Sequence, residues 1–182
     1  MTLPLYTERL AIRRFTHADI DDIMDFSSHP SVAREIPNIP YDNRTKLGDY
    51  VDTQNAYALF EAKKCVDLAV EHVKMGKVIG LLSVVSDGHR QAEIGWGFGV
   101  DHRGHGLATE AARALVTYLL DDCNYHRVFA GTIFTNTRSW KLMERLGMRK
   151  EAHFVKAHVP KEPDGEWIDT VRYAILAEEW MS

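Results

Sequence analysis

At 182 residues, the chain is long enough to bury a hydrophobic core without disulfides or a structural metal, and we expect one domain over residues 1–182. Its formal net charge of −4 argues against a nucleic-acid-binding protein, which normally carries a basic excess. The charge is typical of a solvated acidic surface, and a cationic partner is the alternative. The longest apolar stretch, Val78–Val85, is far shorter than the roughly 20 residues of a membrane helix, and the N-terminus lacks the features of a signal peptide, so a cytoplasmic protein is expected.

The first predicted elements are a strand and two helical regions. Apolar residues alternate with polar ones over residues 8–15, which predicts a strand. Residues Thr16–Asp19 resemble a capping box and predict the start of an amphipathic helix. Prolines between residues 29 and 44 predict a loop-rich region, and a second helical region is expected from about Thr45 to Ala62.

Three strands are predicted next, over residues 66–70, 78–85 and 91–100. Turn signals separate them, at residues 74–76 and at Asp87-Gly88. The short connections indicate an antiparallel meander.

The strand over residues 91–100 has two very different faces. One face is apolar, and the other consists of a glutamate and glycines. The apolar face comprises Ile94, Trp96, Phe98 and Val100, and the glycine face comprises Glu93, Gly95, Gly97 and Gly99. Because glycines in register weaken a strand, we expect a ligand to approach this backbone closely, with a kink or bulge as the alternative.

The junction between this strand and the next helix is rich in glycine. Helical periodicity runs from Leu107 to Leu119, and Gly104 and Gly106 precede it. Several backbone N–H groups can therefore converge on an anion at the positive end of the helix. A dinucleotide fingerprint would need glycine in place of Thr109, and no P-loop ending is present. The pyrophosphate of coenzyme A is the remaining common ligand, and an ordinary glycine-rich turn is the alternative.

The C-terminal part contains three further strands and a short helix. The helix begins at Asn136 or Thr137, which can cap it, and ends at Gly147, which suits a left-handed C-terminal residue. The predicted strands cover residues 127–134, 152–159 and 167–176, the last two being joined by a turn at 160–165. This order of elements is typical of a three-layer α/β fold.

Two ordered motifs resemble the GNAT superfamily of N-acetyltransferases, in particular its ribosomal-protein serine/alanine branch. Residues Arg103–Ala111 are similar to the acetyl-CoA loop, written Gln/Arg-x-x-Gly-x-Gly/Ala, although Asp101 stands at the Gln/Arg position. Residues Asn136–Met148 resemble the Asn-x-x-Ser…Leu-Gly-Phe segment, and Thr7–Arg13 resembles the opening strand of that branch. The resemblance implies a mixed, mostly antiparallel central sheet, splayed at strands 4 and 5, with helices on both faces.

The resemblance also implies the reaction. The expected activity is direct acetyl transfer from acetyl-CoA, without a metal, to a primary amine in a ternary complex, by a monomer or homodimer. The acceptor is expected to be a protein N-terminal α-amine. The alternatives are a small-molecule amine, such as a polyamine or aminoglycoside, and a non-catalytic acyl-CoA-binding protein.

In this family the pantetheine arm lies beside the glycine-bearing strand, and the loop amides bind the pyrophosphate. Because Asp101 replaces the usual side chain, the amides of residues 102–108 must carry that contact. The implied acetyl-CoA-binding residues are Phe98, Val100, His102, Arg103, Gly104, His105, Gly106, Leu107, Ala108, Thr109, Asn136 and Ser139. For Asn136, a simple helix cap is the alternative.

Two residues are the candidates for catalysis. Glu93 stands where family members often place a general base, and a solvated or ion-paired glutamate is the alternative. Ser139 matches the serine that, in the ribosomal-protein branch, is thought to protonate the departing thiol. Many relatives use a tyrosine four residues later, and here that position is Met143. The alternative for Ser139 is a hydroxyl that bonds its own helix.

The histidines do not form a metal motif. His102 and His105 straddle the glycine loop, and no cysteine or carboxylate cluster completes a site, so no metal is expected. In the family, the hairpin between the last strands often borders the acceptor pocket, which makes His158 and Glu162 candidates for its lining, with solvated loop residues as the favoured alternative.

Overall fold

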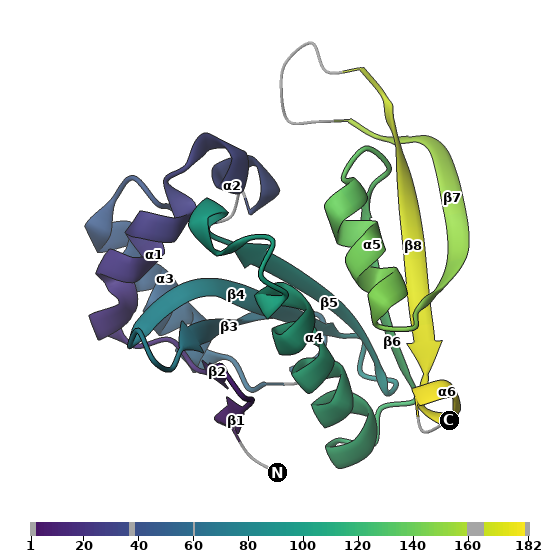
Figure 1. Cartoon of the computed structure of the whole chain (residues 1–182), viewed down its shortest axis with the longest axis horizontal. Coiled ribbons are helices and arrows are strands. Elements are labelled where there is room, and N and C mark those ends of the chain that lie inside the picture. The colour runs from purple at the N-terminus through teal and green to yellow at the C-terminus, as the bar shows by residue number, and fades with distance from the viewer. Residues whose placement is uncertain (1–2, 37–38, 60, 160–165, 181–182) are drawn as a thin grey trace.

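The computed structural model describes residues 3–36, 39–59, 61–159 and 166–180, and its centre is an eight-stranded sheet. The strand order is β1-β2-β3-β4-β5-β6-β8-β7 (Figure 1). Only the β5–β6 pair is parallel; the other neighbours are antiparallel. The strands are β1 (Leu5–Tyr6), β2 (Leu10–Arg13), β3 (Cys65–His72), β4 (Lys77–Ser86), β5 (Gln91–Phe98), β6 (Arg127–Ile133), β7 (Arg149–His158) and β8 (Ile168–Leu176).

Helices cover both faces of this sheet (Figure 1). The first three pack on one face around a buried cluster that includes Ile23 and Leu47. The next two pack on the other face around Leu115 and Met143. The helices are α1 (Ile20–Ser27), α2 (Pro30–Glu35), α3 (Arg44–Ala56), α4 (Leu107–Thr117), α5 (Thr137–Arg145) and α6 (Ala177–Trp180). The predicted three-layer α/β fold is confirmed.

The sheet is splayed between β5 and β6. The two strands pair only from Gln91 opposite Arg127 to Glu93 opposite Phe129. Beyond that point β5 continues to Phe98 and β6 continues to Ile133 without pairing with each other. These are the fourth and fifth strands predicted from the sequence, so the predicted position of the splay is confirmed.

Local capping signals place the helices as predicted. The Thr16 N–H donates to Asp19 Oδ2 at 2.7 Å in a capping box before α1. Asn136 is the N-cap of α5, and Gly147 after its end has a φ of 82°. Helix α4 begins at Leu107 and continues past Thr117 as a π-helical turn, Tyr118–Asp122.

The predicted loop-rich region between residues 29 and 44 contains a helix, α2. Pro30 occupies the first turn, where a missing N–H costs nothing, and His29 Nδ1 accepts the Ser31 N–H at 3.2 Å as a cap. The prolines indicate a loop-rich region, whereas one of them, Pro30, starts a helix. The following helix, α3, is shorter than predicted because the backbone becomes extended at Tyr57.

The predicted apolar face of β5 ends earlier than the alternation indicates. The strand stops at Phe98, and Val100 begins a short 3-10 turn, Val100–His102. Ile94 and Phe98 belong to the cluster under α4 and α5, whereas Val100 packs against the cluster under α1–α3. The assignment of Val100 to the apolar face is therefore wrong, because the backbone turns before it.

The two cysteines form no disulfide with each other. Both cysteines are free; Cys65 is exposed and Cys123 is half-buried. The predicted turn at residues 160–165 lies outside the described residues. Within the described ranges, no helix is both long enough and apolar enough to cross a membrane.

Candidate active site

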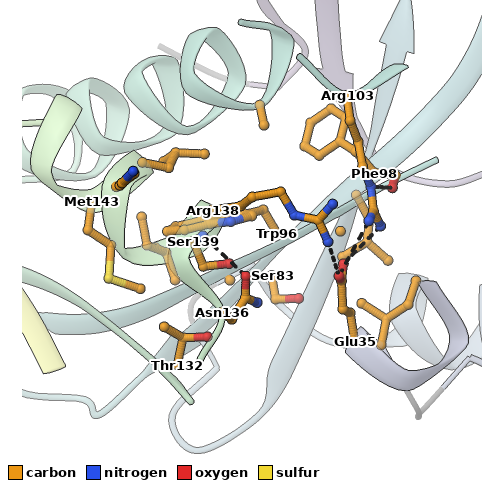
Figure 2. A pocket seen from close by; sticks show the side chains of 18 of the residues that line it. Glu35, Ser83, Trp96, Phe98, Arg103, Thr132, Asn136, Arg138, Ser139 and Met143 are labelled. Atoms are coloured by element: carbon orange, nitrogen blue, oxygen red, sulfur yellow. Dashed lines mark hydrogen bonds and ion pairs between the residues drawn. The ribbon is translucent and has the colours of Figure 1, made fainter. Parts of the chain in front are cut away.

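A cavity of about 1410 Å³ fills the wedge between β5 and β6. Its walls come from α2, β3, β4, β5, the loop before α4, β6 and α5. Figure 2 shows side chains from several of these elements around the cavity, among them Trp96 on β5, Thr132 on β6, and Ser139 and Met143 on α5. The cavity therefore reaches from the glycine loop, through the splay, to the strands beneath α2.

The glycine loop presents free backbone donors to this cavity. Gly104 and Gly106 have φ angles of 84° and 78°, which favour glycine. The N–H groups of residues 104–109 have no hydrogen-bond acceptor in the described part of the chain, and no side chain caps α4. Exposed N–H groups at the positive end of a helix form an anion site.

Thr7 and Arg9, near the N-terminus of the chain, hold this loop through hydrogen bonds to His105 and Glu110. Arg9 donates through Nη1 to the His105 carbonyl at 3.0 Å and through Nε to Glu110 Oε2 at 2.7 Å. The Thr7 hydroxyl donates to Glu110 Oε1 at 2.6 Å. Burial alone would raise the pKa of Glu110, but these hydrogen bonds outweigh it and hold that pKa below its ordinary value. These hydrogen bonds, which we call the clamp, hold the loop in place, and the two glycines of that loop line the cavity.

Arg103 is engaged within the protein. Its Nε donates to the Phe98 carbonyl at 3.0 Å, and its Nη2 lies 2.9 Å from Glu35 Oε2 (Figure 2). Glu35 also binds Arg138 Nη2, which reaches from α5, at 3.1 Å. Glu35 therefore links α2 with the loop and with α5. The guanidinium of Arg103 is therefore already paired within the protein, whereas the loop amides are free to bind an anion.

The glycine face of β5 is only partly open. A Cβ at Gly97 would lie 2.7 Å from Ile36 Cγ2, and one at Gly99 would lie 3.1 Å from Phe26 Cβ. The close approach that we expected from a ligand is made at these two positions by side chains from the α1–α2 layer. At Gly95 the nearest atom would be Ser83 Cβ at 3.6 Å, which is an ordinary contact. Of these three glycines, Gly95 is the one that no side chain of the α1–α2 layer covers.

Ser139 lies in the first turn of α5, on the cavity wall. Asn136 Oδ1 accepts the Ser139 N–H at 3.3 Å, so Asn136 acts as the helix cap (Figure 2). Among the described residues the Ser139 hydroxyl has no hydrogen-bond partner, so it does not bond its own helix. Met143, one turn later, is 1% exposed and lines the same wall. Met143 stands at the position where many relatives have a tyrosine, and the free hydroxyl of Ser139 lies on the same wall.

Glu93 lies at the apex of the wedge, in the last pair that joins β5 and β6. It is half-buried and is not among the residues that line the cavity. Its Oε1 would be 3.8 Å from a Cβ at Gly131, and Gly131 does line the cavity. The carboxylate thus lies just behind the wall.

Most predicted binding residues come together at the cavity. The lining includes Phe98, His102, Arg103, Gly104, Gly106, Leu107, Ala108, Thr109, Asn136 and Ser139, together with His158. Val100 and His105 are not part of it, since Val100 turns toward α1–α3 and His105 offers its carbonyl to Arg9. Burial lowers the pKa of His102 below its ordinary value. Glu162 lies outside the described residues.

Sequence reasoning missed several lining residues. Asp67 gave a usable signal, because a charged residue stands alone inside the apolar strand Val66–Val70. Glu35 and Arg138 gave none, since charged residues on short helices are usually solvated. Within the ranges the structure describes, no group of histidine, cysteine or carboxylate side chains could hold a metal ion.

Comparison with known proteins identifies relatives over most of the chain. A family model described as an acetyltransferase (GNAT) domain matches residues 9–149. The uncharacterised N-acetyltransferase YnaD of Bacillus subtilis is 32% identical over 176 residues, which are 96% of this chain and 97% of the relative. The ribosomal protein uS5 alanine N-acetyltransferase of Escherichia coli is 31% identical over 103 residues, 57% of this chain and 52% of the relative.

Solved structures agree with these matches. A GNAT-family acetyltransferase from Bacillus anthracis has a TM-score of 0.80 and 30% identity, covering 96% of this chain and 99% of that chain. Spermidine N-acetyltransferase from Vibrio cholerae, solved with CoA and spermine, has a TM-score of 0.79 at 20% identity, covering 97% of this chain and 100% of that chain. The second match shows likeness of fold.

Proposed function

Because the chain belongs to the GNAT family of N-acetyltransferases and uses acetyl-CoA as donor, we propose that it acetylates a protein N-terminal α-amine by direct transfer. One observation carries this proposal. A single cavity of about 1410 Å³ joins the free amides before α4, the Ser139 hydroxyl and a polar floor on β3 and β4. Donor and acceptor can meet in it without a covalent enzyme intermediate.

The residues present fit the donor. The unbonded N–H groups of residues 104–109 suit its pyrophosphate. Beyond Glu93, the edge of β5 that faces β6 has no strand partner in the described chain, so its backbone can bond the amides of the pantetheine arm. This path would bring the thioester into the wedge, near Ser139.

The reaction needs only two proton transfers from the side chains, and neither is demanding. The neutral amine attacks the thioester carbonyl, a C–N bond forms, and the C–S bond breaks as the amine loses a proton and the sulfur gains one. An α-amine has a pKa of roughly 7.7–8.0 and a thiol one of roughly 8.5, so both transfers are easy near neutral pH. In our proposal Glu93 takes the proton through water, and Ser139 donates one to sulfur.

Two observations bear on the acceptor. The E. coli relative is named for acetylating an alanine of ribosomal protein uS5, which supports an N-terminal amine. A small cationic amine is the second candidate, because the buried carboxylate of Asp67 faces the cavity, and it is consistent with the V. cholerae neighbour solved with spermine.

A thiol-release assay tests the proposal. The purified chain is incubated with acetyl-CoA and, separately, with N-terminal peptides, polyamines and aminoglycosides. We expect turnover with peptides that carry a free α-amine and none when that amine is blocked. Turnover with small amines alone would overturn the N-terminal acceptor. Binding of acetyl-CoA without turnover of any acceptor would instead indicate an acyl-CoA-binding protein.

A further inference from the structure

The cavity has a polar floor on the side away from the glycine loop. Asp67 on β3, Ser83 on β4 and Gly95 on β5 are direct neighbours in one row across the sheet, and all line the cavity. The adjacent row on the same face includes Gly97, which Ile36 covers. The Asp67 row is therefore where the apolar layer under α1–α3 stops and the open cavity begins.

The carboxylate of Asp67 is held firmly in place. It is 8% exposed, and its Oδ2 accepts the Tyr50 hydroxyl at 2.6 Å. The Asp67 N–H donates to Gln54 Oε1 at 2.8 Å, and the Cys65 thiol lies 3.6 Å from Oδ1. All these partners are neutral. They orient the carboxylate without cancelling its charge.

The absence of a cation at Asp67 sets it apart from the other buried aspartate. Asp19, 5% exposed, is bound by Arg13 through two hydrogen bonds of 2.7 and 2.8 Å. No lysine, arginine or histidine pairs with Asp67 in the described part of the chain. A buried carboxylate without a counter-ion is costly, and a cation that enters the cavity would relieve that cost.

Burial and the nearby charge of Asp67 both raise the pKa values of two neighbouring groups. Partial desolvation and the carboxylates of Asp67 and Glu93 raise the pKa of the Cys65 thiol to about 12. Burial and the Asp67 charge likewise raise the pKa of the Tyr50 hydroxyl. Both groups resist gaining negative charge because they are partly or largely buried and because the Asp67 carboxylate lies beside them. The same field attracts a positive ligand.

We propose that Asp67 binds a positive charge of the acceptor other than the amine that is acetylated. This inference rests on the proposed acetyl transfer. The reacting nitrogen must lose its proton, and a fixed carboxylate beside it would raise its pKa and oppose that loss. A second, permanent cation keeps its proton and gains from the carboxylate. The acceptor is therefore a primary amine with an additional ammonium or guanidinium group.

Two sources could supply this second charge, and matched acceptors separate them. One pair is 1,4-diaminobutane and butylamine. The other is an N-terminal peptide with lysine at its second residue and the same peptide with norleucine there. We expect wild-type kcat/KM to favour the charged member of at least one pair by about tenfold or more. The pair that shows the preference identifies the source.

The variant Asp67→Asn removes the charge and preserves the shape. It should abolish the preference by raising KM for the charged acceptor, while KM for the uncharged acceptor and for acetyl-CoA stays unchanged. Asp52→Asn removes the same charge from an exposed position on α3 and should keep the preference. If Asp67→Asn folds poorly, Ser83→Lys places an ammonium directly across from Asp67 and should abolish the preference as well.

Calorimetry separates this inference from the proposed function. We expect the charged acceptor to bind the wild-type complex with CoA at least about tenfold more tightly than it binds the Asp67→Asn complex. Equal binding by the two proteins, or equal use of charged and uncharged acceptors, overturns the role of Asp67 and leaves the acetyltransferase assignment intact. Cation binding that depends on Asp67, without any thiol release, supports the inference and overturns the N-terminal acetylation.

Discussion

At the scale of single residues, the two proposed catalytic groups differ in how directly they reach the cavity. The Ser139 hydroxyl lies on the wall with no partner among the described residues. The Glu93 carboxylate lies just behind the wall, beside Gly131. Ser139 can therefore contact a ligand directly, whereas Glu93 needs a bridging water.

Substitution of these two residues tests their roles. We expect Ser139→Ala and Glu93→Gln each to lower kcat by roughly 10- to 100-fold, around the low end for general acid–base catalysis, because neither proton transfer is demanding. The dissociation constant of acetyl-CoA, measured by calorimetry, should stay nearly unchanged. Full activity in both variants would show that Glu93 is not the general base and that Ser139 is not the proton donor.

At the scale of elements, the N-terminus of α4 combines a loop whose left-handed conformation favours glycine with the hydrogen bonds that Thr7 and Arg9 make to Glu110. Gly106 adopts a φ of 78°, which costs an L-residue roughly 1–2 kcal/mol. We expect Gly106→Ala to raise the dissociation constant of acetyl-CoA by about tenfold as the amides lose their alignment. Gly48→Ala, inside α3 with only an ordinary contact to His17, should leave that constant unchanged and stabilise the chain by about 0.5–1 kcal/mol. An equal effect of both substitutions would contradict the role of the loop.

The clamp on Glu110 predicts a pH dependence. The pKa of Glu110 in the folded chain is below its ordinary value of 4.5, so its contribution to stability is complete above pH 4.5 and is lost as pH falls through the folded pKa. We expect the difference in unfolding free energy between wild type and Glu110→Gln to shrink below pH 4.5. Denaturant titrations from pH 7 to pH 3 measure this difference. A constant difference over that range would show that Thr7 and Arg9 do not stabilise the charged form.

At the scale of the whole molecule, the α1–α2 layer decides which part of β5 a ligand can reach. Ile36 occupies the space above Gly97, and nothing of that kind covers Gly95. We expect Gly97→Ala to destabilise the fold by about 1–3 kcal/mol through overpacking, whereas Gly95→Ala should unfold at nearly the wild-type denaturant concentration. Gly95→Ala should instead raise KM, because its methyl group enters the cavity. If Gly97→Ala and Gly95→Ala lost similar amounts of stability, the Ile36 side chain would have to move aside at little cost.

Local patterns in the sequence were enough for most elements and for the glycine loop before α4. The capping residues Thr16 and Asn136, the left-handed Gly147 and the glycines before Leu107 act through contacts a few residues apart. Such contacts leave a signature in any short window of sequence. Helix α2 was missed within the same kind of window, because a proline can either end a helix or begin one.

Contacts between distant segments were decided only by the tertiary structure. The turn of Val100 toward α1–α3, the cover of Ile36 over Gly97 and the link from Glu35 to Arg138 each join elements far apart in the chain. The same holds for Asp67, whose lack of a cationic partner emerges only when every neighbouring strand and helix is in place. Periodicity indicates which face of a strand a residue occupies, but the packing of the layers determines what meets that face.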